Sequence, residues 1–209
     1  PARSRFRGCL LGLAVGDALG TTLEFRAPGS FAPLTDMIGG GPFGLQPGQW
    51  TDDTSMALCL AHSLLHCRGF DAVDQMNRYC NWYRHGYMSS TGECFDIGGT
   101  VSQALEAYLR SGDPFSGSQA ESSAGNGSLM RLAPVAMYYA HSPLAVVATM
   151  AADSSRITHA ATEAVDACVL FAAQLRMALA GHDKQAILLG HGATPDAPAI
   201  AALALRDHV

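Results

Sequence analysis

Apolar side chains recur every three or four residues through most of this chain, and this spacing constrains the possible fold more than any other feature. Residues three, four and seven positions apart share one face of an α-helix, so the pattern predicts a series of amphipathic helices. No segment alternates between apolar and polar residues as a strand does. We therefore predict an all-α fold in which helices pack into one compact bundle.

Several expected helices are followed by a glycine, a residue that commonly ends helices in the left-handed conformation. Gly69, Gly86, Gly112 and Gly181 are in this position. Pro143 suits the first turn of a short helix. The expected helices, by residue number, are 6–17, 56–67, 72–83, 101–109, 129–139, the short helix opened by Pro143, 160–180, and two weaker segments near 185–189 and 197–205.

The length of 209 residues and the absence of an internal linker predict a single domain spanning residues 1–209. Thirteen Lys and Arg residues against 18 Asp and Glu give a net charge of −5, and no basic run occurs, so a nucleic-acid surface is not expected. No apolar run is long enough to cross a bilayer, and the start lacks an apolar signal core. The six cysteines form no C-x-x-C pair and are expected to be buried free thiols in a cytoplasmic protein.

Three loops rich in glycine and polar residues, at 28–49, 88–99 and 116–128, each lead into a helix. The N–H groups at the start of a helix favour anions such as phosphate, and glycine lets a ligand approach the backbone closely. Gly125-Asn-Gly-Ser could therefore cradle a phosphate or a ribose. A turn in which Ser128 caps the next helix is the simpler interpretation of these residues alone.

The segment Thr51-Asp-Asp-Thr is the most informative motif. Thr51 or Asp52 could cap the following helix, and acids suit its first turn. Capping accounts for one carboxylate and leaves the adjacent one unexplained. Carboxylate and hydroxyl oxygens are hard ligands for Mg²⁺, Mn²⁺ or Ca²⁺, so the residues alone support a metal site and a cap about equally.

Four other residues have a structural and a functional interpretation. Asp17 lies on the apolar face of the first helix, where a carboxylate needs a partner or a metal ion. Glu24 could be a solvated surface acid, Asp96 a cap before two glycines, and His159 a structural histidine. Glu24 and His159 are each more easily read as structural when they are taken alone.

The order of these motifs resembles the ADP-ribosylglycohydrolase family, which includes the bacterial dinitrogenase reductase-activating glycohydrolases. The resemblance runs from about residue 7 to residue 180. The motifs that carry it are Gly16-Asp-Ala-Leu-Gly, Glu24, Trp50-Thr-Asp-Asp-Thr-Ser-Met, Asp96-Ile-Gly-Gly-Thr, Gly125-Asn-Gly-Ser-Leu-Met-Arg and Ile157-Thr-His.

This resemblance implies a two-metal centre, with Mg²⁺ or Mn²⁺, that cleaves the glycosidic bond between ADP-ribose and a protein side chain, often arginine, or a small molecule. It implies that Glu24 and Asp96 are catalytic, and that Asp17 supports the site from the first helix. The implied metal ligands are Thr51, Asp52, Asp53 and Glu24, and the implied substrate contacts are Gly99, Ser123, Gly125, Asn126, Gly127, Ser128 and His159.

The sequence departs from the family in one respect. The resemblance implies a second metal motif, Gly-x-Asp-x-Asp-Thr, near the C-terminus, but Asp183, Asp196 and Asp207 are isolated in residues 181–209. Either the C-terminal part of the protein is missing from this chain, which the ending slightly favours, or the protein is naturally short. A naturally short protein could be a non-catalytic relative that binds ADP-ribose-like ligands or a partner protein.

Overall fold

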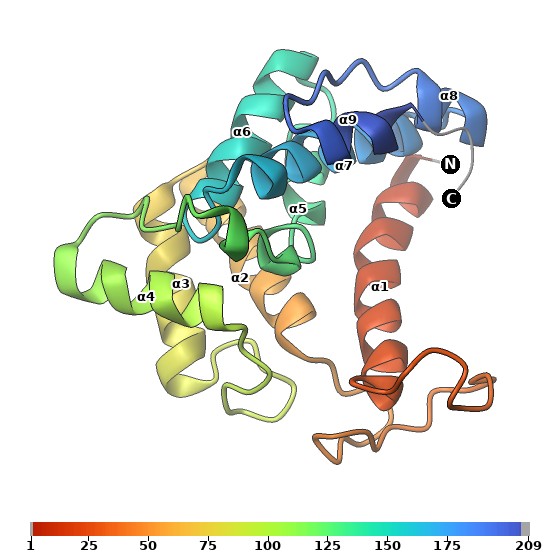
Figure 1. Ribbon diagram of the computed structural model, residues 1–209, viewed down its shortest axis with the longest axis vertical. Helices are drawn as coiled ribbons and strands as arrows, with labels where there is room; N and C mark the ends of the chain where they lie inside the picture. Colours follow the sequence, from red (N-terminus) through yellow and green to blue (C-terminus); the bar gives the residue numbers. More distant parts are fainter. Residues whose placement is uncertain (1, 206–209) are drawn as a thin grey trace.

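A computed structural model describes residues 2–205, and within them it shows helices joined by loops, with two isolated β-bridges and no strand (Figure 1). The predicted all-α fold is confirmed. The α-helices are α1 (Ala2–Gly20), α2 (Asp52–Cys67), α3 (Ala72–His85), α4 (Gly99–Ser111), α5 (Ala133–Tyr138), α6 (Leu144–Arg156), α7 (Thr162–Ala180), α8 (Lys184–Leu189) and α9 (Pro198–Ala204). Short 3₁₀ turns occur at η1 (Thr21–Leu23), η2 (Glu121–Ser123) and η3 (Asn126–Ser128).

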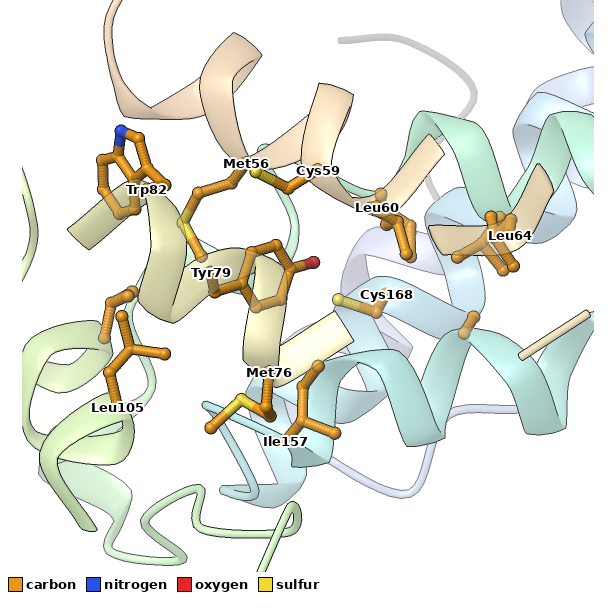
Figure 2. Packing of buried hydrophobic residues seen from close by; sticks show 14 of the residues in the cluster. Met56, Cys59, Leu60, Leu64, Met76, Tyr79, Trp82, Leu105, Ile157 and Cys168 are labelled. Carbon is orange, nitrogen blue, oxygen red and sulfur yellow. The ribbon is translucent and has the colours of Figure 1, made fainter. Parts of the chain in front are cut away.

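Helix α2 lies at the centre of the fold and packs against α1, α3 and α5, while α6 packs along α7. Its apolar face supplies Met56, Cys59, Leu60 and Leu64 to the main core (Figure 2). Met76 and Tyr79 of α3 meet this face, and Ile157 and Cys168 belong to the same cluster, with Ile157 beside Met76. The four-residue repeat that predicted this helix is therefore the face that the core buries.

Three details of the expected helices are wrong. Pro143 does not lie in the first turn of a short helix, because it is the N-cap residue of α6, which has 13 residues. Arg68, rather than Gly69, is the left-handed residue that ends α2. The helix expected over 129–139 is shorter, because the chain first forms the η3 turn and α5 begins only at Ala133, with Pro134 in its first turn. The cap of α5 is Leu132, which has no side-chain capping bond, so Ser128 does not cap this helix.

The six cysteines are free thiols, as predicted, although only Cys59, Cys80 and Cys168 are fully buried. Within residues 2–205, no helix is both long and apolar enough to cross a membrane. Asp207, one of the three isolated acids near the C-terminus, lies outside the described residues.

The connection between α1 and α2 folds at the C-terminal end of α1, near the start of α2 (Figure 1). The Thr22 hydroxyl donates to the Gly39 carbonyl at 3.0 Å, and Gly40 and Leu45 form a β-bridge. Gly41 has φ +68°, and a Cβ there would lie 2.5 Å from the Thr21 carbonyl oxygen. Glycine is needed at this position, because only glycine tolerates both the angle and the close approach.

Candidate functional site

The first turn of α2 is held by a carboxylate from α1. Asp17 accepts hydrogen bonds from the backbone N–H groups of Thr51 (3.0 and 3.1 Å) and Thr54 (3.0 Å). It also accepts from the hydroxyls of Thr51 (2.9 Å) and Thr54 (2.6 Å). Thr51 is the N-cap of α2 but makes no side-chain capping bond, and Asp52 is the first helical residue. The expected cap is therefore supplied by Asp17, from 34 residues away.

Because Asp17 supplies the cap of α2, neither Asp52 nor Asp53 is needed as its cap. Asp52, Asp53, Glu24 and Asp96 line one cavity of about 340 Å³. The Ser90 hydroxyl donates to the Trp50 carbonyl at 2.6 Å, which ties the loop that carries Asp96 to the start of α2. The other cavity-lining residues are Gly98, Gly99, Thr100, Val101, Gly125, Asn126, Gly127, Met130 and His159.

The acids of this cavity disfavour one another's charge. Burial, followed by the charges of Asp53 and Asp96, raises the pKa of Asp52 to about 8. Burial, followed by the charge of Asp17, raises the pKa of Asp53 to about 6. Burial and the neighbouring Glu24 carboxylate raise the pKa of Asp96 to about 7. The ion pairs found within residues 2–205 involve none of these acids.

Asp96 adopts a left-handed backbone conformation, with φ +58°. The residue that caps α4 is Gly98, which makes no side-chain capping bond, so Asp96 does not act as the cap. Non-glycine residues in this conformation are uncommon and concentrate at functional sites. The strained backbone delivers the carboxylate to the cavity beside Glu24.

His159 also forms part of the cavity wall and is only 2% exposed. Arg131 donates to the Thr158 hydroxyl at 2.7 Å, and that hydroxyl lies 2.9 Å from His159 Nδ1. Among the described contacts the hydroxyl has no other acceptor, so it donates to Nδ1 and leaves the proton of the neutral ring on Nε2. Burial, followed by the charge of Arg131, lowers the pKa of His159 to about 4, which keeps the ring neutral near pH 7.

The glycine-rich third loop packs directly on this histidine. A Cβ on Gly127 would lie 2.8 Å from His159 Cε1 and 2.9 Å from Val101 Cγ2, whereas a Cβ on Gly125 would lie 3.7 Å from His159 Nε2. The backbone N–H of Ala160 donates to the Ser118 carbonyl at 2.9 Å, which anchors the start of the loop. Glycine at position 127 thus allows the loop to approach the imidazole.

Comparison with known proteins shows which family the chain belongs to. The family model described as ADP-ribosylglycohydrolase matches residues 1–207. The chain belongs to the ADP-ribosylglycohydrolase family. It is 48% identical to ADP-ribosylarginine hydrolase Tri1 of Pseudomonas putida, over all of this chain and 53% of that protein. It is 36% identical to the ADP-ribosyl-[dinitrogen reductase] glycohydrolase of Rhodospirillum rubrum, over 74% of this chain and 51% of that one.

A solved structure titled ADP-ribosylglycohydrolase-related protein complex has the same fold. It superposes with a TM-score of 0.80 at 42% identity and covers 97% of this chain and 74% of its own. The chain spans about half the length of the protein relatives that it matches. The family assignment therefore applies to a segment that corresponds to about half of each of these relatives.

Not all of the residues that the family resemblance singled out face the cavity. Thr51 and Asp17 line a neighbouring hollow of about 350 Å³, together with Glu24 and Asp53. Ser128 is 1% exposed and its hydroxyl accepts from Ser155 at 2.9 Å, so it faces the interior. The Ser123 hydroxyl donates to the Ala120 carbonyl at 2.6 Å, and this residue shapes the loop outside the cavity lining.

The structure adds residues that sequence reasoning missed. Gly98, Thr100, Val101 and Met130 line the cavity, and the Gly-Gly-Thr that opens α4 was a signal for the first two. Thr158 and Arg131 position His159 from behind. Arg131 is fully buried, and its Cζ lies 4.6 Å from the centroid of the Tyr79 ring. No local sequence pattern predicts this contact.

The donor chemistry of the site suits a hard divalent cation, since Glu24, Asp52 and Asp53 are neighbouring carboxylates that form no ion pair with a basic side chain of residues 2–205. Within residues 2–205, however, no three His, Cys, Asp or Glu side chains converge closely enough to hold an ion by themselves. The acids therefore fit a cation in type and charge, and supply only part of a ligand set.

Proposed function

We propose that this chain forms the acid-bearing and ADP-ribose-binding part of a hydrolase that cleaves the glycosidic bond between ADP-ribose and a modified protein side chain, arginine in particular. One observation carries the proposal: Glu24, Asp52, Asp53 and Asp96 share a single cavity with His159 and the Gly125–Gly127 loop. The arginine acceptor is taken from the relative named as an ADP-ribosylarginine hydrolase.

Hydrolysis of a glycosidic bond passes through an oxocarbenium-like state and needs carboxylates that transfer protons. A general acid or base works best when its pKa lies near the working pH. The pKa of Asp96, raised to about 7 by burial and by Glu24, meets this requirement. We assign proton transfer to Asp96 and the orientation of the attacking water to Glu24.

The ADP-ribose would lie between the acids and the wall formed by His159. The Nε2–H of the neutral imidazole can donate a hydrogen bond into the cavity, and the glycines let a diphosphate or ribose approach the loop backbone. Gly99 opens α4 on the same cavity, where unpaired N–H groups favour negatively charged oxygens.

We further propose that Asp52, Asp53, Glu24 and Thr51 supply oxygen ligands for Mg²⁺ or Mn²⁺, with the remaining ligands coming from outside these residues. Such a cation would bind ribose hydroxyls or water and lower the pKa of the water. The free thiols are consistent with work in the cytoplasm, where disulfides are rare.

Release of free ADP-ribose from ADP-ribosyl-arginine, measured with Mn²⁺ or Mg²⁺ and the complete gene product, tests the proposal. We expect release that is lost in Asp52→Asn and Asp53→Asn and retained in Glu163→Gln, which removes an exposed acid from the start of α7. ADP-ribose binding without release above these variants would instead support the non-catalytic alternative. The chain spans about half the length of the ADP-ribosylarginine hydrolase that it matches, so ligands for a metal ion could lie outside these residues.

A further inference from the structure

A third, larger hollow lies beside the cavity lined by Glu24, Asp52, Asp53 and Asp96, which we call the acid cavity. It measures about 780 Å³ and is built from the connection between α1 and α2. Glu24 lines this hollow as well as the acid cavity, so one carboxylate stands between the two. We call the larger hollow the outer chamber. Apart from Glu24, its walls include Phe25, Phe31, Leu34, Ile38, Arg26 and Asp36.

A row of three phenylalanines lies beside the same acids. The ring centroids of Phe25 and Phe43 are 6.4 Å apart in an edge-to-face arrangement, and those of Phe43 and Phe95 are 5.3 Å apart. Phe25 directly follows Glu24, and Phe95 directly precedes Asp96. The two segments that deliver carboxylates to the cavity therefore also deliver the ends of this aromatic row.

Phe25 is unusual for a phenylalanine in a folded protein. It is 81% exposed and has φ +61°, a conformation that bulky side chains rarely adopt. An exposed ring gains little from burial, and the left-handed backbone adds strain, so folding alone does not account for this placement. Its position next to Glu24 points to a ligand instead.

The chemistry of the surroundings selects the ligand. Aromatic faces attract cations, and the planar guanidinium of arginine stacks on them particularly well. The carboxylates of Glu24 and Asp36 line the outer chamber and outnumber its one cationic residue, Arg26. A positively charged, flat group therefore complements this surface better than a neutral or anionic group.

The position of Glu24, between the acid cavity and the outer chamber, indicates which part of the substrate the three phenylalanines would contact. With ADP-ribose on the His159 side of the acids, the group on the other end of the glycosidic bond extends past Glu24 into the outer chamber. We propose that the outer chamber and the Phe25–Phe43–Phe95 row form the acceptor subsite, which binds the guanidinium of the arginine side chain as it leaves ADP-ribose. This inference rests on the proposed function.

Binding of the leaving group can be measured without turnover. The probes are N-acetyl-arginine methylamide and its neutral citrulline analogue, each titrated by NMR into the complete gene product saturated with ADP-ribose. We expect the arginine probe to bind more tightly than the citrulline probe. Phe25→Ala should weaken arginine binding by about two- to fivefold, the size of an exposed cation–π contact, and leave the affinity for ADP-ribose unchanged.

Three further variants sharpen the result. Phe25→Leu keeps an apolar side chain but lacks the aromatic face, so it should lose arginine binding as Phe25→Ala does, whereas Phe25→Trp should retain it. Phe115→Ala removes a phenylalanine that is 46% exposed and lines none of these hollows, and should change nothing. Because Phe25 contributes little buried surface, all of these proteins should fold, which thermal melting verifies.

Two outcomes would overturn the inference. Equal affinities for the arginine and citrulline probes would show that the row does not recognise a cation. An equal loss of ADP-ribose affinity in Phe25→Ala would show that the row holds the nucleotide instead. Either result leaves the proposed hydrolase standing. Guanidinium binding as expected with no release of ADP-ribose would contradict the proposed function alone.

Discussion

The carboxylate of Asp17 accepts a hydrogen bond of 2.6 Å from the Thr54 hydroxyl and binds the N–H groups of Thr51 and Thr54 as well. One side chain of α1 thus satisfies the unpaired donors at the start of α2 and fixes the segment that carries Asp52 and Asp53.

Replacing Asp17 should therefore destabilise the fold more than the loss of an ordinary helix cap. We expect Asp17→Ala to lower the free energy of unfolding by about 2–4 kcal/mol, because several hydrogen bonds to a charged group are lost together. Urea denaturation measures this change. Asp183→Ala is the matched control, since Asp183 caps α8 through one exposed bond to Ala186, and it should cost about 1 kcal/mol. An equal loss of unfolding free energy in the two variants would show that the hydrogen bonds of Asp17 do not stabilise the start of α2 more than an ordinary cap does.

Asp52→Asn should reduce activity far more than stability. Burial and neighbouring acids already favour the neutral form of this side chain, with its pKa near 8, so a neutral amide should leave the unfolding free energy within about 1 kcal/mol. Loss of a charged ligand should lower ADP-ribose release by at least about 100-fold. Parallel urea denaturation and release assays check both numbers. A loss of stability that accounts for the lost activity would point to a structural role instead.

The acid cavity should make stability fall as pH rises. Acids with raised pKa values bind more protons in the folded state than in the unfolded state. Their contribution to the free energy of unfolding is therefore complete below pH 4, and it is lost as the pH rises towards the pKa of each acid in the folded protein. Between pH 6.5 and 8, we expect a loss of about 1–2 kcal/mol in the presence of EDTA. Denaturation at successive pH values measures it. Asp52→Asn should flatten this slope, and Mn²⁺ should reduce it by favouring the ionised acids. A slope that is unchanged in Asp52→Asn would contradict the assignment.

His159 should act in the opposite direction at lower pH. Its pKa is lowered to about 4 by burial and by Arg131, so below pH 6.5 the unfolded chain takes up a proton that the folded chain refuses. This contribution to the free energy of unfolding is complete above pH 6.5. As the pH falls from 6.5 to 4, about 2–3 kcal/mol of it is lost. Comparing His159→Asn with the parent protein over this range removes the contribution of the acids. Parallel curves for the two proteins would show that His159 does not titrate as the geometry implies.

The third loop offers a test with two neighbouring glycines. Gly127→Ala should weaken ADP-ribose binding by roughly tenfold or more, because its Cβ would press on His159 and Val101 at distances below 3 Å. Gly125→Ala has room and an ordinary backbone conformation, so its binding should stay close to that of the parent. Calorimetric titration with ADP-ribose compares them. Equal effects of the two substitutions would show that the approach of the loop to His159 does not matter.

Much of the fold could be predicted from the sequence because the helices obey local rules. The apolar repeat placed α2, α3, α4 and α7 within a few residues, and Gly86, Gly112 and Gly181 do end helices as expected. The repeat over 129–139 was misleading, because residues 129 to 132 belong to a turn whose side chains are partly or fully buried all the same.

The site could be predicted only in part, because its decisive contacts join distant residues. Motif order brought together the four acids and His159, which the structure places in one cavity. Nothing local indicates that Asp17 caps a helix 34 residues away, or that Ser128 faces Ser155. The aromatic row was missed for the same reason: its three phenylalanines meet only because the loops that carry them fold together.

The crowding of uncompensated carboxylates has a consequence for protein engineering. Selection for heat resistance favours any change that removes repulsion from a folded structure, whether or not the changed group is useful. In this chain such selection should replace Asp52, Asp53 and Asp96 by neutral residues early, since their charges oppose folding. The positions at which a thermostable library loses its acids would then outline the reactive centre without any substrate being supplied.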